Sequence, residues 1–159
     1  MARRTKIAVF GAGLIGAHVG GRLAPHADVT LIGRPWLMEA LATGLRVTDL
    51  EGFDLNLQPG DFRMTTDPAG LEGADLVLVA VKSLATKEAA EAIAAHAPPA
   101  APVISLQNGV SNPEILRAGL PGRAVLAAMV PFNVSQPAPG QFHRGTGVGK
   151  IVIEADEAL

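Results

Sequence analysis

Residues 9–16 read Val-Phe-Gly-Ala-Gly-Leu-Ile-Gly, which places three glycines at the spacing G-x-G-x-x-G. The apolar segment 6–10 that leads into them is typical of a short buried strand, and segment 14–23 after them has the composition of a close-packed helix. A second apolar strand follows at 28–32. The whole is about thirty residues long, as a right-handed crossover between parallel strands requires. The stretch therefore predicts a strand–turn–helix–strand unit at the start of an α/β fold.

The three glycines have different tasks in such a unit. Gly11 permits the tight turn, Gly13 lets a pyrophosphate approach the backbone, and Gly16 allows the helix to lie close to the strand. The anion would meet free N–H groups and the positive end of the helix dipole. The residues expected at the pyrophosphate are Gly11, Ala12, Gly13, Leu14, Ile15 and Gly16. Two alternatives stay open, a glycine-rich turn that serves only helix packing and a site for another nucleotide or a methyl donor.

The rest of the chain continues to alternate strands and helices. Residues 45–57 alternate apolar and polar side chains about a turn at 51–52, which predicts an antiparallel hairpin at a sheet edge or over one face. Further helices are expected at 36–42, 84–97 and from 112 or 113 to 118, and further strands at 75–81, 103–106, 124–130 and 150–155. Residues 131–149 are rich in proline, glycine and glutamine. We expect one α/β domain over residues 1–159, with a doubly wound, mostly parallel Rossmann-type sheet and helices on both faces.

Composition narrows the possible functions. The chain has 159 residues with 13 basic and 15 acidic side chains, and the basic residues are not clustered, so a general nucleic-acid binder is not expected. It has no cysteine, which excludes disulfides, thiolate zinc sites and a cysteine nucleophile and is compatible with a cytoplasmic location. A secretory signal at the N-terminus is disfavoured because glycines and His18 interrupt the apolar stretch. No metal cluster, catalytic triad or membrane span is expected.

The second strand ends in Gly33 and Arg34, where many dinucleotide-binding units carry a carboxylate for the adenosine ribose. Asp28 lies at the opposite end of this strand from the expected crevice. A carboxylate at the carboxyl end would repel the 2'-phosphate of NADP, whereas glycine leaves room for it and arginine can form charge-assisted bonds to it. The sequence therefore predicts NADP(H) as the cofactor, with Arg34 at the 2'-phosphate. The alternative is a solvated surface arginine before a proline.

Two later strands also end in polar side chains. Lys82 and Ser83 follow the strand at 75–81, and Gln107 and Asn108 follow the strand at 103–106. In a doubly wound sheet both loops face the same crevice as the glycine turn, so Lys82 can reach a ribose or a substrate anion and Asn108 offers an amide near the nicotinamide. The alternatives are a lysine that snorkels at a strand end and an Asn-Gly hairpin turn.

These motifs resemble, as an ordered set over essentially the whole chain, the N-terminal domain of the 2-dehydropantoate 2-reductase (ketopantoate reductase) family. They are GAGLIG at 11–16, GR at 33–34, VAVKS at 79–83, LQNG at 106–109 and FHRGTGVGKIVIE at 142–154. The resemblance implies NADPH-dependent reduction of a 2-keto acid, in that family ketopantoate to pantoate in pantothenate and coenzyme A synthesis. It implies that the glycines bind the pyrophosphate, Arg34 the 2'-phosphate, Lys82 the cofactor side of the cleft, and Asn108 both nicotinamide and substrate.

The sequence departs from this family at its end. Family members carry a helical C-terminal domain that supplies the catalytic lysine, whereas this sequence ends at Leu159. We therefore expect the cofactor-binding half alone, with no catalytic residue of its own and no turnover. Among the histidines only His143, expected in a polar loop, is a candidate for the cofactor site. The open alternatives are a reductase of another 2-keto acid or an opine-type substrate, a non-catalytic NADP-sensing module, and a homodimer formed through the surface that the second domain would cover.

Overall fold

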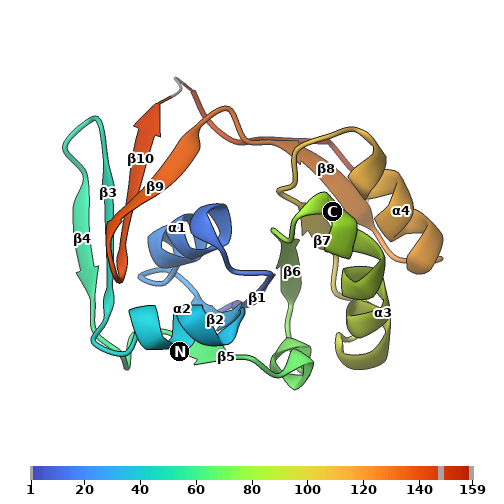
Figure 1. Cartoon of the computed structure of the whole chain (residues 1–159). Coiled ribbons are helices and arrows are strands. Elements are labelled where there is room, and N and C mark those ends of the chain that lie inside the picture. The colour runs from blue at the N-terminus through green and yellow to red at the C-terminus, as the bar shows by residue number, and fades with distance from the viewer. Residues whose placement is uncertain (1, 147–148, 158–159) are drawn as a thin grey trace.

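The computed structural model describes residues 2–146 and 149–157, and two β-sheets enclose the first helix between them (Figure 1). Within these residues the larger sheet has seven strands in the order β11-β8-β7-β6-β1-β2-β5. The strands are β1 Lys6–Phe10, β2 Asp28–Ile32, β5 Arg63–Thr65, β6 Leu76–Val79, β7 Val103–Ser105, β8 Val125–Met129 and β11 Val152–Ile153. Every neighbouring pair is parallel except β11 and β8. The expected mostly parallel α/β sheet is confirmed.

Helices cover both faces of this sheet. They are α1 Leu14–Leu23, α2 Pro35–Ala40, α3 Thr86–His96 and α4 Ser111–Gly119, with short 3-10 turns η1 Pro68–Leu71 and η2 Ser83–Ala85. One core cluster joins α1 and α2 to one face through Val9, Leu31 and Leu37. The other joins α3 and α4 to the opposite face through Ile93 and Leu116. None of the helices in the described ranges is long and apolar enough to cross a membrane.

The strand order places a topological switch between β1 and β6. From β1 the chain passes through α1 to β2 on one side, and after β5 it returns through η1 to β6 on the other side. The two strands that flank the switch pair in parallel up to Phe10 and Val79. In open α/β sheets the ligand crevice lies outside the carboxyl ends of the strands at such a point. The fold therefore marks the end of β1, where the glycine turn begins.

The second sheet contains four strands within the described residues, in the order β4-β3-β10-β9. These strands are β3 Leu45–Asp49, β4 Asp54–Leu57, β9 Asn133–Ala138 and β10 Gln141–Thr146. The expected hairpin at 45–57 is confirmed as β3 and β4, paired from Leu45 with Leu57. The expectation that His143 lies in a polar loop was wrong, because β9 and β10 pair antiparallel and β10 pairs parallel with β3. His143 consequently lies in a strand and not in a loop.

Helix α1 packs against both sheets through glycines. A Cβ atom at Gly20 would lie 2.5 Å from Leu31 of the larger sheet, and one at Gly21 would lie 2.5 Å from Val47 of the second sheet. Larger side chains at these two positions would push the sheets away from the helix. The glycines inside the apolar stretch at 14–23 are therefore explained by close packing on two sides.

His18 is buried between α1 and the second sheet with one ring nitrogen unpaired. Its Nε2 lies 3.2 Å from the carbonyl oxygen of Thr48, so Nε2 must carry the proton of the neutral ring. Nδ1 is buried and has no hydrogen-bond partner among the described residues. Burial lowers the pKa of His18, and the nearby charges of Arg22 and Arg144 lower it further, against opposing contributions from the Thr48 bond and Asp49. The folded protein therefore favours the neutral histidine.

We expect this burial to make the fold acid-sensitive near neutral pH. The folded pKa of His18 lies below its unfolded value of about 6.5, so the unfolded chain binds more protons and stability falls as the pH drops through that value toward the folded pKa. His18→Gln keeps a donor for Thr48 and cannot be protonated. Urea unfolding at pH 7.5 and 5.5 should show a smaller pH-dependent loss of unfolding free energy in the variant than in the wild type. Equal losses would show that His18 does not titrate differently on folding.

Candidate cofactor site at the switch point

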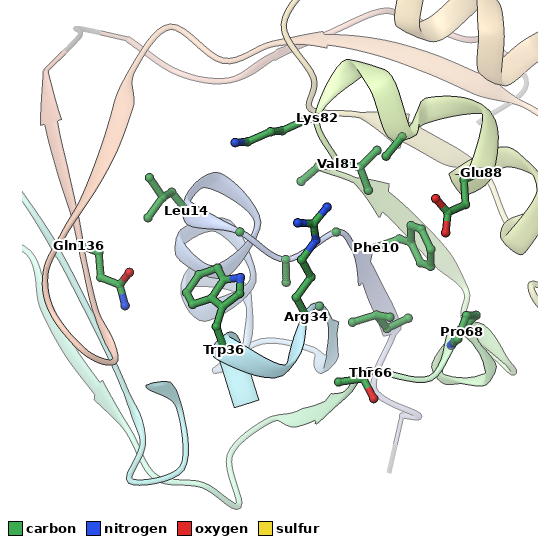
Figure 2. A pocket seen from close by; sticks show the side chains of 17 residues that line it. Phe10, Leu14, Arg34, Trp36, Thr66, Pro68, Val81, Lys82, Glu88 and Gln136 are labelled. Atoms are coloured by element: carbon green, nitrogen blue, oxygen red, sulfur yellow. The ribbon is translucent and has the colours of Figure 1, made fainter. Parts of the chain in front are cut away.

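A cavity of about 660 Å³ opens at the carboxyl ends of β1, β2 and β6 (Figure 2). Its size falls within the range of about 300–1,000 Å³ that is typical of small-molecule sites. It is lined by Phe10, Gly11, Ala12, Gly13, Leu14, Ile32, Gly33, Arg34, Trp36, Thr66, Pro68, Ala80, Val81, Lys82, Ala85, Glu88 and Gln136. The cavity therefore occupies the crevice that the strand order marks.

The glycine turn uses its first backbone donors internally and leaves the next ones free. The N–H groups of Gly11 and Ala12 both donate to the carbonyl of Ile32 at 2.9 Å, and that of Gly13 donates to Gly11 at 2.8 Å. The first three residues of α1 are Leu14, Ile15 and Gly16. In the described ranges their N–H groups donate no hydrogen bond to any acceptor. Among the described residues, moreover, no side chain caps the positive end of helix α1 and no acidic side chain lies in its first turn.

The three glycines of the turn differ in how close an added Cβ atom would come to neighbouring atoms. Gly11 has φ +81, and a Cβ atom there would lie 2.7 Å from the backbone nitrogen of Val81. A Cβ atom at Gly16 would lie 3.0 Å from Val9 and 3.2 Å from Ala80, so this glycine serves helix packing. A Cβ atom at Gly13 would meet no atom closer than the Gly11 oxygen at 4.0 Å. Nothing in the part of the chain that the structure describes requires glycine at position 13, where the backbone borders the cavity.

Arg34 lies two residues after the end of β2 and immediately before the first residue of α2. Its backbone is extended, its side chain is exposed, and the guanidinium projects into the cavity in front of the glycine turn (Figure 2). It forms no ion pair or hydrogen bond through this side chain within residues 2–146 and 149–157. Asp28 lies at the other end of β2, where it accepts a bond of 2.9 Å from Arg4. An unpaired cation thus stands where a ribose carboxylate is usual.

Gly33 has a packing reason that the sequence did not indicate. A Cβ atom there would lie 2.7 Å from the Leu37 side chain and 3.0 Å from the carbonyl oxygen of Ala12. The end of β2 therefore lies against the glycine turn, and Gly33 allows this approach. Room for a phosphate is not needed to explain this glycine.

Lys82 is a second cation of the cavity, and its side chain has no ion-pair or hydrogen-bond partner among the described residues. It follows β6, its side chain is exposed, and it extends above the first turn of α1 (Figure 2). Among the residues that line the cavity, the single carboxylate is Glu88, from the first turn of α3. The lining therefore favours an anionic ligand at the centre of the cavity, between the two cations and the free N–H groups.

Not every residue expected at the site lines the cavity. The structure brings together six of them, Gly11, Ala12, Gly13, Leu14, Arg34 and Lys82, and leaves Ile15, Gly16 and Asn108 outside the lining. Asn108 is exposed at the end of β7, and its backbone carbonyl accepts a bond of 2.6 Å from the Asn112 side chain. His143 also lies outside the lining, and its Nδ1 is 2.8 Å from the Thr48 hydroxyl in the second sheet.

Four side chains at the cavity that carry polar atoms, besides several apolar ones, were missed in the sequence. Trp36 and Thr66 follow β2 and β5, Glu88 comes from α3, and Gln136 comes from β9 of the second sheet. Trp36 could have been inferred because it lies two residues after Arg34. Gln136 carries no such signal, because only the packing of the second sheet brings it to the glycine turn. Within the described part of the chain no group of three His, Asp or Glu side chains could hold a metal ion.

The comparison with known families shows which family the chain belongs to. The family model described as ketopantoate reductase PanE/ApbA matches residues 7–157. The chain belongs to the ketopantoate reductase family. A 2-dehydropantoate 2-reductase of Halobacterium salinarum is 35% identical over 151 residues, which make up 93% of this chain and 48% of that protein.

Crystal structures of ketopantoate reductases have the same fold. One from Ralstonia eutropha JMP134 superimposes with a TM-score of 0.85 at 39% identity, over 96% of this chain and 50% of that one. The 2-dehydropantoate 2-reductase from Geobacter metallireducens GS-15 superimposes with a TM-score of 0.80 at 26% identity, over 94% and 48% of the two chains. The chain thus spans about half the length of these ketopantoate reductases.

Proposed function

We propose that this chain binds NADPH as the cofactor-binding half of an enzyme that reduces 2-dehydropantoate to pantoate in pantothenate and coenzyme A synthesis. The observation that carries the proposal is the set of free N–H groups at the start of α1, beside the open space at Gly13. A pyrophosphate fits these donors because they need an acceptor that the described part of the chain does not supply. Membership of the ketopantoate reductase family supports the choice of reaction.

The residues of the cavity take separate roles in this proposal. The free N–H groups of α1 bind the pyrophosphate, and Arg34 binds the 2'-phosphate as a charge-assisted partner. Lys82 binds the cofactor on the other side of the cavity, and Asn108, which does not line the cavity, meets the nicotinamide and the keto acid. When bound, NADPH supplies the hydride that converts the keto carbon to a 2-hydroxy acid.

The proton for the new hydroxyl group needs a donor as well. We propose that it comes from a helical domain outside residues 1–159, which matches the half-length coverage of the relatives. The isolated chain is then expected to bind cofactor without turnover. A reductase of another 2-keto acid would share the cofactor site and differ in that second part, whereas an NADP-sensing module would bind without any partner domain that supplies an acid.

The test of the cofactor assignment is the affinity for NADPH and NADH before and after the change Arg34→Gln. Trp36, the single tryptophan of the chain, lines the cavity and reports binding through its fluorescence. At one salt concentration the variant should lose about 10- to 150-fold in NADPH affinity, since a charge-assisted bond contributes about 1.5–3 kcal/mol. The affinity for NADH should change little, because NADH has no 2'-phosphate.

Arg63→Gln is the matched control for this experiment. Arg63 is an exposed arginine of the neighbouring strand β5 that does not line the cavity. The Arg63→Gln variant has the same net charge as the Arg34→Gln variant. It should bind NADPH and NADH with the wild-type affinities. Equal NADPH and NADH affinities in the wild type would remove the role of Arg34. Binding of neither cofactor would contradict the assignment of a dinucleotide site to this chain alone.

A further inference from the structure

A buried polar network lies behind the loops that carry Lys82 and Asn108. It consists of Thr86 at the start of α3, Asn112 in α4, and Ser105 and Gln107 at the end of β7. Thr86, Ser105 and Asn112 are at most 1% exposed and Gln107 is 8% exposed. None of the four lines the cavity, so contact with the cofactor does not explain them.

Gln107 joins the end of β7 to the end of β6. Its Nε2 donates to the carbonyl of Val81 at 3.0 Å and to the hydroxyl of Thr86 at 2.8 Å. Its Oε1 accepts from the hydroxyl of Ser105 at 3.0 Å, which fixes the orientation of the amide. The bond to Val81 holds the residue immediately before Lys82.

Thr86 and Asn112 complete the connection on the other side of Lys82. The Thr86 hydroxyl lies 2.9 Å from both the Ser83 carbonyl and the Asn112 Oδ1, and its one proton serves these two acceptors. The Asn112 Nδ2 donates to the Ser83 hydroxyl at 3.1 Å and to the Asn108 carbonyl at 2.6 Å. The network therefore holds the residues on both sides of Lys82 and the backbone of Asn108 itself.

Packing alone gives a poor account of four buried polar side chains. Each costs free energy on burial unless it is bonded, and apolar side chains of similar size would fill the same space without that cost. Every polar side-chain atom of the network has a partner, since the unpaired buried atoms of the described residues lie on His18 and Arg144. A fully bonded network of this kind fixes one arrangement of the segments that it joins.

We infer that the Gln107–Thr86–Asn112 network is a positioning element that holds Lys82 and Asn108 at a fixed spacing for the nicotinamide end of the cofactor. The inference rests on the proposed function and adds that separate sets of residues hold the adenosine half and the nicotinamide half of the cofactor. The glycine turn and Arg34 hold the adenosine phosphates, and they make no bond to the network. Loosening the network should weaken binding of the nicotinamide half and spare the adenosine half.

Thr86→Val tests this division because it removes the central hydroxyl and preserves the shape of the side chain. The probes are NADPH and adenosine 2',5'-bisphosphate, which carries both adenosine phosphates and no nicotinamide. We expect the variant to bind NADPH about tenfold more weakly, as the loss of one well-made contact would produce, and to bind the bisphosphate within about twofold of wild type. Thr86→Ser restores the hydroxyl and should restore the NADPH affinity.

Thr48→Val is the control for removing a threonine hydroxyl elsewhere. That hydroxyl bonds His143 in the second sheet, away from the network, so both affinities should stay at the wild-type value. If Thr86→Val does not fold, Asn112→Ala decides the question by the same comparison, because it removes the bond to Asn108. A parallel loss of both ligands, or no loss of either, would overturn the positioning role. Failure of the wild-type chain to bind either ligand would instead contradict the proposed function.

Discussion

Replacing Gly11 with alanine is expected to lower the free energy of unfolding by about 3 kcal/mol or more. Gly11 has φ +81, a conformation that alanine adopts only with strain. The added Cβ would also lie 2.7 Å from the backbone nitrogen of Val81 and 2.8 Å from its Cα, so the ends of β1 and β6 would have to separate. Urea denaturation followed by circular dichroism measures the change. The same variant should lose cofactor affinity, because the turn and Lys82 move apart.

Gly13→Ala is the matched control for Gly11→Ala, two residues further along the turn. Among the described residues other than its two chain neighbours, its Cβ would meet no atom closer than 4.0 Å, and its φ of -100 is accessible to alanine. The cost in unfolding free energy should stay within about 1 kcal/mol, the difference between glycine and alanine at a helix N-cap. The proposed function also predicts that NADPH affinity falls, because the methyl group would occupy the space that the proposal assigns to the pyrophosphate. Equal destabilisation by both alanines would show that the contact with Val81 does not set the stability of the turn.

The parts of the fold that the sequence predicts are those with local signals. The strand at Lys6–Phe10 and the helix after it follow from an apolar run and a glycine turn that lie next to each other. The strand at Leu76–Val79 is a continuous apolar run, and the structure buries it on both faces. Boundaries were less accurate, since the expected helix at 84–97 begins as the 3-10 turn η2 and becomes α-helical at Thr86.

The second sheet could not be predicted from the sequence, because its strand order depends on pairing between segments that are far apart along the chain. Strand β10 pairs with β3 about a hundred residues earlier, as His143 with Thr48, and its neighbour β9 contains Pro137. Local composition in this segment favours turns, and tertiary contacts override it. The same long-range pairing brings Gln136 to the cavity and removes His143 from it. Arg34 and Lys82 were foreseeable at the cavity because each lies within two residues of the carboxyl end of a predicted strand of the larger sheet.

The second sheet is also expected to be part of one cooperative unit with the rest of the chain, and Phe142 is the residue that tests this. Phe142 lies on β10, is fully buried, and belongs to the core cluster that includes Val9 of β1 and Ala17 of α1. Phe142→Ala removes most of a large side chain from this core and should cost about 3–5 kcal/mol in unfolding free energy. Far-ultraviolet circular dichroism and Trp36 fluorescence should report one coincident transition during urea unfolding.

Leu50→Ala is the control for loss of apolar volume in the same part of the fold. Leu50 lies in the turn between β3 and β4 and is 63% exposed, so its truncation should change stability by no more than about 0.5 kcal/mol. A loss of less than about 1 kcal/mol in Phe142→Ala, or two separate transitions, would show that the second sheet folds apart from the larger one. A single transition with the large loss would mean that α1 is held from both sides, so that the sheet behind the helix helps to fix the free N–H groups at its start.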